Sequence, residues 1–195
     1  SNTVNLDITA KFIMPTVGDA GMGVVGNGSF ANSFGIFCTD QKVQVGVRGS
    51  SGIKSFQSST IAAGTVVTAR LQYDSSLPTG FLGTVNSESG TDADSITGDI
   101  SDGSTIEIGS TNGCIQSYAG FFGGKILSVS YTQDGVEKFN YDFQNNIGTT
   151  TVLDTSASGN NGTVTNATLA NFWGARVADT SGSLVSADYA VGNTS

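Results

Sequence analysis

The sequence predicts an all-β fold, an antiparallel β-sandwich of two sheets, on three observations. Short runs in which apolar and polar residues alternate recur along the chain, as expected for half-buried strands. Residues typical of turns separate these runs at intervals of about 8–12 residues. Apolar residues nowhere keep the helical period of about 3.6 residues over ten or more positions.

The clearest predicted strand covers residues 4–14, in which every second residue is apolar. Pro15 should end it, because proline has no amide hydrogen to donate within a central strand. In residues 42–48 the apolar positions are Val43, Val45 and Val47. The other expected strands are residues 22–26, 34–38, 53–57, 65–73, 81–85, 105–108, 115–122 and 149–153, with one further strand at most in 164–173.

Residues 123–144 are expected to form a hairpin at the centre of one sheet. Two alternating runs flank Gln133-Asp134-Gly135, and Asp-Gly between such runs favours a tight turn. A two-residue turn would mix serines and aromatic residues on both faces. We therefore expect a three-residue loop closed by Thr132 and Val136, with Gly135 in a G1 bulge. This register places the following residues on one face: Leu127, Val129, Tyr131, Glu137, Phe139, Tyr141 and Phe143.

Composition narrows the possible partners. Charged residues are 12% of the chain, and 27 glycines accompany a surface rich in Ser, Thr and Asn. A net charge of −8 argues against a nucleic-acid partner, which requires a basic surface. No apolar run of about 18 residues occurs, so membrane insertion is not expected. Cys38 and Cys114 are expected to be buried free thiols, with a single disulfide as the alternative.

We expect two parts along the chain. Residues 1–173 carry all the recognisable strands and should form one sandwich domain. In residues 174–195 small residues dominate and bulky apolar ones are too sparse for a core. That part is expected to be a C-terminal tail, an extra edge strand or a connection to a further segment.

Three segments carry a resemblance to a known family. Residues 65–75 end in Tyr-Asp, residues 106–126 contain an Ile-Gly, a loop and a Phe-x-Gly-x-Ile sequence, and residues 139–163 contain Tyr-Asp-Phe followed by Asp-x-Ser-x-x-x-Asn-x-Gly-Thr. Their order resembles the concanavalin A-like lectin/glucanase superfamily, in particular its laminin-G-like jelly rolls. The position of the third segment after the hairpin is similar to versions found in tailed-phage structural proteins. The resemblance implies a jelly roll that binds carbohydrate or attaches a virion to its host.

Enzymatic chemistry has little support in the sequence. Histidine is absent, which excludes His-assisted nucleophiles and His metal ligands, and no G-x-S-x-G, P-loop or cysteine cluster occurs. A glycosidase needs two carboxyl groups about 5–10 Å apart. The glutamates Glu88, Glu107 and Glu137 are expected on a loop, a strand and the hairpin. We therefore expect a protein that is not an enzyme, with a polysaccharide hydrolase or lyase as the least favoured alternative.

Two acidic segments are candidate metal sites. Carboxylates on a loop suit Ca²⁺, and laminin-G-like domains often hold this ion near a loop rim. A calcium site is one interpretation of the first segment, and a solvated acidic loop is the other; its aspartates are Asp92, Asp94, Asp99 and Asp102. The second segment combines Asp154 with Asn160 and Asn161, which also suit Asx-turns.

A sugar site needs an aromatic ring beside amide or carboxylate groups. Tyr118, Phe121 and Phe122 near Asn112 fit this description, although core packing is the simpler expectation for both phenylalanines. Trp173 is expected either to cap the core or to lie at a partner surface. The candidate ligand-binding residues are Asn112, Tyr118, Asn160, Asn161 and Trp173.

The combined expectation is a carbohydrate-binding or host-attachment module on a virion surface, either a capsid decoration or a tail component. Its partners would be a glycan or cell-surface polysaccharide and other virion proteins. The alternative is an assembly domain that binds protein through an exposed strand edge or through residues 174–195.

Overall fold

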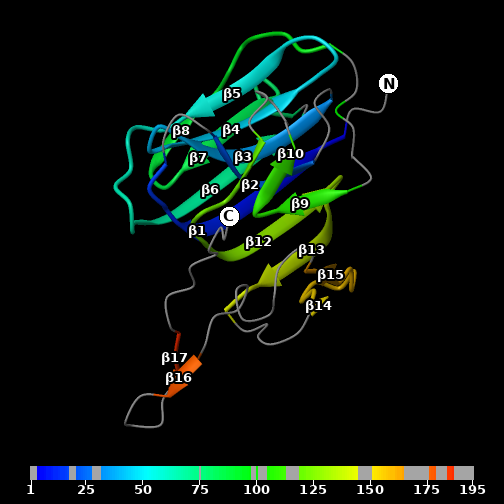
Figure 1. The fold of residues 1–195 in the computed structure, drawn as a ribbon. Helices are drawn as coiled ribbons and strands as arrows, with labels where there is room; N and C mark the ends of the chain where they lie inside the picture. Colours follow the sequence, from blue (N-terminus) through cyan, green and yellow to red (C-terminus); the bar gives the residue numbers. More distant parts are fainter. Residues whose placement is uncertain are drawn as a thin grey trace.

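A computed structural model describes residues 4–17, 21–27, 32–74, 76–97, 100, 105–112, 119–144, 151–164, 176–178 and 184–186. These residues form strands, turns and bends (Figure 1). Within them there is no helix of the length and apolarity needed to cross a membrane. The predicted all-β class is confirmed.

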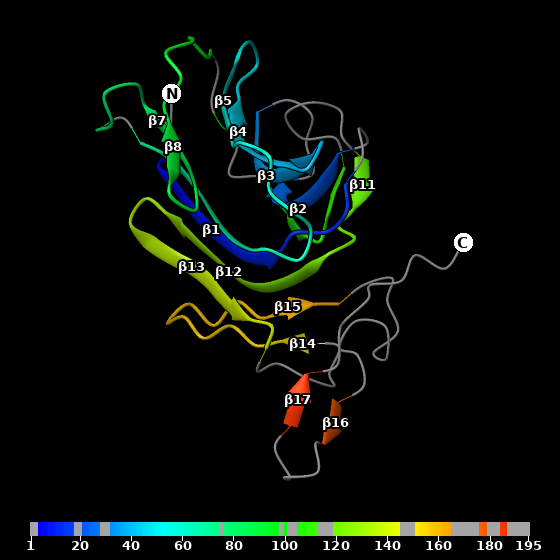
Figure 2. The same ribbon diagram turned by 90° about the vertical axis from the view of Figure 1, so that its left-hand side faces the viewer.

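Two antiparallel sheets face each other (Figures 1 and 2). The six-stranded sheet has the order β13 (Val136–Asp142), β12 (Lys125–Gln133), β1 (Leu6–Ile13), β6 (Val66–Tyr73), β7 (Phe81–Val85) and β8 (Glu88–Gly90). The five-stranded sheet has the order β5 (Ile53–Gln57), β4 (Lys42–Arg48), β3 (Ser33–Thr39), β2 (Met22–Asn27) and β9 (Ile106–Ile108). The remaining strands form two-stranded ladders: β10 (Ser110–Asn112) with β11 (Ala119–Phe121), β14 (Thr151–Val152) with β15 (Gly162–Thr163), and β16 (Arg176–Ala178) with β17 (Leu184–Ser186).

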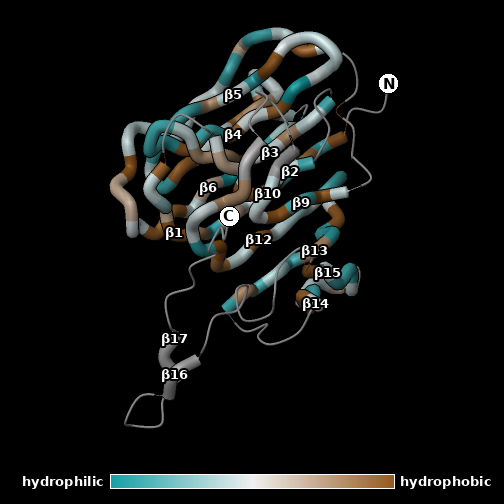
Figure 3. The backbone as a smooth tube through the Cα atoms, in the orientation of Figure 1, coloured by the Kyte–Doolittle hydropathy of each residue, from teal (hydrophilic) through white to brown (hydrophobic). Residues whose placement is uncertain are grey.

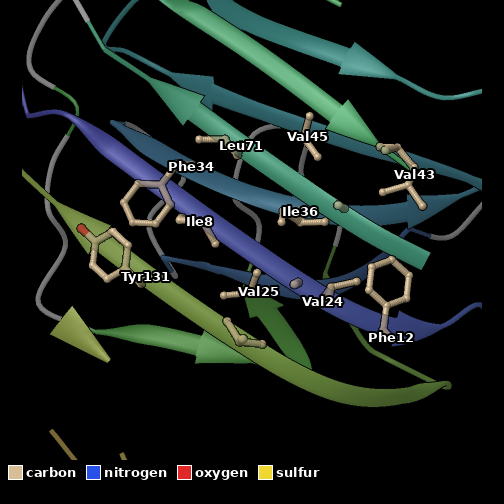
Figure 4. Close-up of a cluster of buried hydrophobic side chains, with 14 of the residues drawn as sticks. Ile8, Phe12, Val24, Val25, Phe34, Ile36, Val43, Val45, Leu71 and Tyr131 are labelled. Atoms are coloured by element: carbon tan, nitrogen blue, oxygen red, sulfur yellow. The ribbon is translucent and has the colours of Figure 1, made fainter. Parts of the chain in front are cut away.

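The predicted alternation determines which side chains enter the core. Along β1 and its flanks the residues predicted to face inward are all buried: Val4, Leu6, Ile8, Ala10, Phe12 and Met14. From the other sheet, Val43, Val45 and Val47 are fully buried. Apolar and polar residues alternate along several strands in Figure 3, and Figure 4 shows the buried side chains meeting between the sheets. The core is therefore formed by the inner faces of both sheets.

The two sheets pack closely against each other near β5, β7 and β8. Phe56 lies against two glycines of the six-stranded sheet. A Cβ added at Gly83 would lie 2.4 Å from Val45 Cγ2 and 2.6 Å from Phe56 Cβ. A Cβ added at Gly90 would lie 2.4 Å from Phe56 Cδ2. Both positions therefore need glycine so that the Phe56 ring can fit between the sheets.

The β12–β13 hairpin corrects our prediction of its turn. Gln133 pairs with Val136, so the loop has two residues, Asp134 and Gly135. Their φ values of 51° and 77° are those of a type I′ turn, which Asp-Gly favours. The predicted three-residue loop is wrong, because Asp-Gly readily adopts the two positive φ values of a two-residue type I′ turn. Residue 5 supports the turn, since Asn5 N donates to Asp134 Oδ1 and Asp134 N donates to Asn5 O, both at 2.9 Å.

The predicted faces are nevertheless correct for the aromatic residues of the hairpin, whereas Glu137, predicted to share the face of Tyr131, pairs with Thr132 of the other face. A bulge follows the turn, because Thr132 pairs with Glu137 while Tyr131 pairs with Phe139, which leaves Lys138 as the extra residue. The bulge returns the aromatic residues to the core face, where Phe139 and Tyr141 are buried and stack with ring centroids 4.5 Å apart. The hairpin is not central, however. β1 holds the central place, and β13 is an edge strand.

The chain after β7 also differs from the prediction. Glu88 was expected on a loop, but it begins the strand β8, which pairs with β7. Of the strand expected at residues 115–122, residues 119–121 form β11, and residues 115–118 lie outside the described residues. A further strand, β10, precedes it and pairs with it.

Candidate functional site

The β10–β11 hairpin extends the five-stranded sheet beyond β2. β9 pairs with β2 from Val25 to Asn27. At Gly109 the chain adopts a φ of 78° and donates its N–H to Val24 O at 2.8 Å. β10 then continues beside β2 (Figure 1), and β11 pairs with β10. A glycine suits this position because it permits a positive φ without steric cost.

Phe122 fixes the hairpin to the core. It is buried, and its ring meets that of Phe12 edge-to-face with centroids 5.4 Å apart. Phe122 N donates to Gly109 O at 2.8 Å. Gly124 completes the fit, since a Cβ there would lie 2.5 Å from Ile13 O and 2.8 Å from the Phe122 ring. The backbone on both sides of Phe122 is therefore closely constrained.

Phe121 points away from the core as a consequence. Successive side chains of a strand point to opposite faces, so a buried Phe122 places Phe121 outward. Phe121 is 71% exposed, the largest value among the exposed large apolar side chains. Its expected core position is therefore wrong, whereas that of Phe122 is confirmed. The period of two was the signal that could have separated these neighbours.

A polar residue accompanies this exposed ring. Ser110 pairs directly with Phe121, and directly opposite residues of an antiparallel ladder have their side chains on the same face. Asn112, a predicted ligand residue, pairs with Ala119 two positions along β10. Tyr118 and Trp173 lie outside the described residues. The hairpin thus combines a solvent-exposed aromatic face with a neighbouring hydroxyl group, which suits a sugar ring.

The predicted residues Asn160 and Asn161 belong to a second feature, the Asp154 loop (residues 154–161). Asp154 Oδ1 accepts hydrogen bonds from Asn140 N and Ser156 N, both at 2.8 Å. Its Oδ2 accepts from Ser156 Oγ and Asn160 N, both at 2.7 Å. Asn161 Oδ1 in turn accepts from Asp154 N at 2.9 Å. These hydrogen bonds within the loop are those expected of an Asx-turn, which the sequence analysis gave as the alternative to a metal site.

The same loop covers the free edge of β13. Asn160 Nδ2 donates to Lys138 O at 2.7 Å, and Thr155 N donates to Asn140 O at 2.9 Å. Tyr141 donates its hydroxyl to Asn160 O at 2.6 Å. Backbone groups that would otherwise face solvent along an edge strand are thereby paired. The amide groups of this loop hold it to the sheet, and a role for Asn160 and Asn161 in sugar binding stays a prediction.

The Asp154 carboxyl has a lowered pKa. Partial burial raises this pKa, but the hydrogen bonds from three backbone amides and the Ser156 hydroxyl together outweigh burial and lower it. The carboxylate therefore stays ionised within its ring of donors.

The acidic segment that includes Asp92 covers the other sheet in a similar way. Asp92 Oδ2 accepts from Ser55 N on the edge strand β5 at 2.9 Å, and its Oδ1 accepts from Asp94 N at 2.9 Å. The buried Lys54 donates its Nζ to Asp92 O at 2.9 Å. Asp94 is exposed. Each Asp92 carboxylate oxygen thus already has a structural partner.

Calcium binding in this segment stays a prediction. Within the described part of the chain, no group of three or more Asp, Glu, Cys or His side chains is placed to hold a metal ion. Asp99 and Asp102 lie outside the described residues.

The three glutamates do not form a hydrolytic pair on shared or neighbouring strands. Glu88 is on β8 and Glu137 on β13, which are opposite edges of the six-stranded sheet. Glu107 is on β9 of the other sheet. Glu88 Oε2 also accepts from Ser59 N at 2.8 Å. Two of the three glutamates therefore lie on opposite edges of one sheet, and the third lies on the other sheet.

The described cysteine is chemically inert in the folded state. Cys38 is a free, fully buried thiol, and burial raises its pKa to about 12. Cys114 lies outside the described residues.

Solved structures share this fold. A scan against protein-family models and a search of curated proteins both find no match. The mouse laminin α1 chain, domains LG4-5, superposes with a TM-score of 0.51 and 19% identity over 66% of this chain and 35% of that one. A candidate carbohydrate-binding protein of Bacteroides ovatus superposes with a TM-score of 0.56 and 16% identity over 82% of this chain and 51% of that one. The matched region thus spans a third to a half of these proteins.

These similarities identify the fold as a laminin-G-like, concanavalin A-like jelly roll. The fold expected from the three sequence segments is confirmed.

Proposed function

We propose that this protein is a non-catalytic glycan-binding module that contacts its sugar at the β10–β11 hairpin. The observation that carries the proposal is Phe121, an aromatic side chain that is 71% exposed on a strand fixed by a buried neighbour. An exposed aromatic ring on a strand that is fixed to the core is available to stack on the apolar face of a ligand. A sugar ring has an apolar C–H face for the aromatic ring and hydroxyl groups for polar neighbours such as Ser110.

The fold supports this proposal. Jelly rolls of this class present hairpins and loops on a rigid sandwich, so the backbone that carries Phe121 is held in place without ligand. Rigid placement reduces the entropy lost on binding. The placement of the glutamates supports a binding role rather than a hydrolytic one.

The test is the Phe121→Ala variant on a glycan array, followed by calorimetry with each sugar that the native protein binds. We expect a loss of at least about tenfold in affinity, equivalent to about 1.4 kcal/mol. Val136→Ala is the matched control, because Val136 is also exposed, at 53%, but lies at the β12–β13 turn. Failure of the native protein to bind any sugar would contradict the proposal.

The finer proposal is attachment of a virion to a cell-surface polysaccharide. It rests on the resemblance of the glycine-rich, lysine-poor sequence and its segment order to tailed-phage structural proteins. Identification of the proteins encoded beside this one tests it, because capsid or tail proteins are expected there. An assembly role through a bare strand edge receives no support from β13 or β5, since loops cover both edges.

A further inference from the structure

We infer that the sugar bound at the β10–β11 hairpin is a neutral glycan that lays an apolar ring face on Phe121. The inference rests on the proposed function and specifies its ligand class. It excludes sulfated, sialylated and uronic-acid glycans as preferred ligands.

The first argument is the charge of the segment itself. Residues 108–124 contain no Asp, Glu, Lys or Arg, and this segment includes β10, β11 and the connection between them. The polar residues of β10, which lies in the described part of this segment, carry only hydroxyl and amide groups: Ser110, Thr111 and Asn112. Such groups donate to and accept from sugar hydroxyls. They do not supply the charge-assisted bonds with which proteins hold sulfate or carboxylate groups.

The second argument is that Lys125, Arg70 and Lys54 already have interaction partners. Lys125 follows the segment directly and already has an interaction partner. Arg70 forms an ion pair with Asp7 on the outer face of the six-stranded sheet, where Arg70 Nε lies 2.9 Å from Asp7 Oδ1. Lys54 is buried and bonded to Asp92 O. Drawing any of these cations to an anionic sugar would break an existing interaction.

The third argument is the charge of the whole chain. Its net charge of −8 creates a negative potential that opposes the approach of anionic polysaccharides. This repulsion acts over about 8–10 Å at physiological ionic strength. An anionic ligand would therefore face repulsion at long range and no compensating cation on the hairpin.

The aromatic contact gives the neutral ligand its affinity. The face of a Phe ring carries negative partial charge, which attracts the polarised C–H groups of a sugar ring. A hexose with several C–H bonds on one side presents such a face. Because Ser110 lies beside Phe121, a hydroxyl at the rim of the sugar ring finds a hydrogen-bonding partner there.

The experiment compares neutral, sulfated and sialylated forms of the same oligosaccharide backbones, lactose, 3′-sulfated lactose and 3′-sialyllactose among them, on the full chain. Array hits are measured by calorimetry at about 50 mM and about 500 mM NaCl, which changes the screening length severalfold. We expect the neutral form to bind most tightly, with an affinity that changes less than about twofold between the two salt concentrations.

The Lys125→Gln variant is the second measurement. It should leave neutral-glycan affinity unchanged, whereas Phe121→Ala should lower it at least about tenfold. Tighter binding of the sulfated or sialylated form, a steep fall in affinity with salt, or a loss in Lys125→Gln would overturn the inference while leaving glycan binding intact. Absence of binding to every sugar would overturn the proposed function and this inference together.

Discussion

Gly83 shows how one missing side chain sets the distance between the sheets. Its Cα faces Val45 and Phe56 of the opposite sheet, with no space for a methyl group. Interiors packed to this density respond to an added carbon by shifting backbone or leaving a rotamer minimum. The aromatic side chain of Phe56 thus occupies volume that a larger residue at position 83 would need.

We expect Gly83→Ala to lower the free energy of unfolding by about 1–3 kcal/mol, because the new Cβ would lie 2.4 Å from Val45 Cγ2. Chemical denaturation measures the change. Gly123→Ala is the matched control, since its Cβ would lie 3.6 Å from Met22 Sδ, an ordinary contact distance. Equal stabilities for the two variants would show that the sheets can separate at Phe56 without cost.

At the scale of the element, two loops protect two edge strands by the same means. On β13 the amide of Asn140 donates to the Asp154 carboxylate, and on β5 the amide of Ser55 donates to the Asp92 carboxylate. A carboxylate here takes the place of the carbonyl oxygen that a further strand would offer. Edges closed in this way are poor templates for pairing with another chain.

Asp154→Asn should therefore open the β13 edge. The amide retains one acceptor oxygen where the carboxylate offers two, so at least two of the four donors lose their partner. We expect a loss of about 1–3 kcal/mol in the free energy of unfolding at neutral pH. Faster hydrogen exchange at the Asn140 amide would locate the opening.

The pH dependence of this loss follows from the lowered pKa of Asp154. A carboxyl whose pKa is lower in the folded state stabilises the fold fully above its unfolded pKa of about 3.9. This contribution disappears as the pH falls through the folded-state pKa. The difference between native protein and Asp154→Asn should accordingly shrink below about pH 4. Asp94→Asn, at an exposed carboxylate, is the control and should leave the free energy of unfolding at neutral pH nearly unchanged.

Strands with strong alternation were predictable, and the exceptions have local causes. β1 follows directly from its period of two, because only one of its faces is buried and this admits a single assignment. The type I′ turn was missed because the prediction assumed an unbroken ladder after the turn. The bulge at Lys138 allows a two-residue turn and still buries the aromatic residues. Alternation of apolar and polar residues alone does not reveal such a bulge. β8 was missed because Glu88-Ser89-Gly90 has no apolar residue to mark a strand.

The candidate site was only partly predictable for a related reason. The aromatic cluster near Asn112 was visible in the sequence, but which of Phe121 and Phe122 enters the core depends on the edge-to-face contact with Phe12. Asn160 and Asn161 were selected for their chemistry. Their bonds to Lys138 and Asp154 depend on the loop lying along β13, a tertiary contact.

At the scale of the whole molecule, β1 joins distant parts of the chain. Leu6 pairs with Tyr73 on one side and with Gln133 on the other. The central strand thus acquires both neighbours only when most of the chain is in place. Folds dominated by such long-range pairing fold slowly, in about milliseconds to seconds, and are expected to open cooperatively.

Cys38 offers a direct measure of this opening. In a Cys114→Ser variant we expect the native protein to resist thiol reagents, because Cys38 is fully buried and its pKa is raised to about 12. Labelling should require global unfolding and accelerate in Val47→Ala in proportion to the stability lost, since Val47 is fully buried in the same core. If Cys38 is labelled rapidly and at the same rate with and without Val47→Ala, β3 opens without global unfolding. The same variant in denaturant supplies the reference rate.

Phe121 is exposed and Phe122 is buried, which determines which substitutions the β10–β11 hairpin tolerates. Phe122 carries the attachment of the hairpin to the core, whereas Phe121 contributes little to that core. Substitutions at Ser110 and Phe121 should therefore alter sugar recognition without lowering the free energy of unfolding. Stability and specificity are separately adjustable here, which makes this hairpin a suitable position for randomised libraries that select new sugar specificities on an unchanged scaffold.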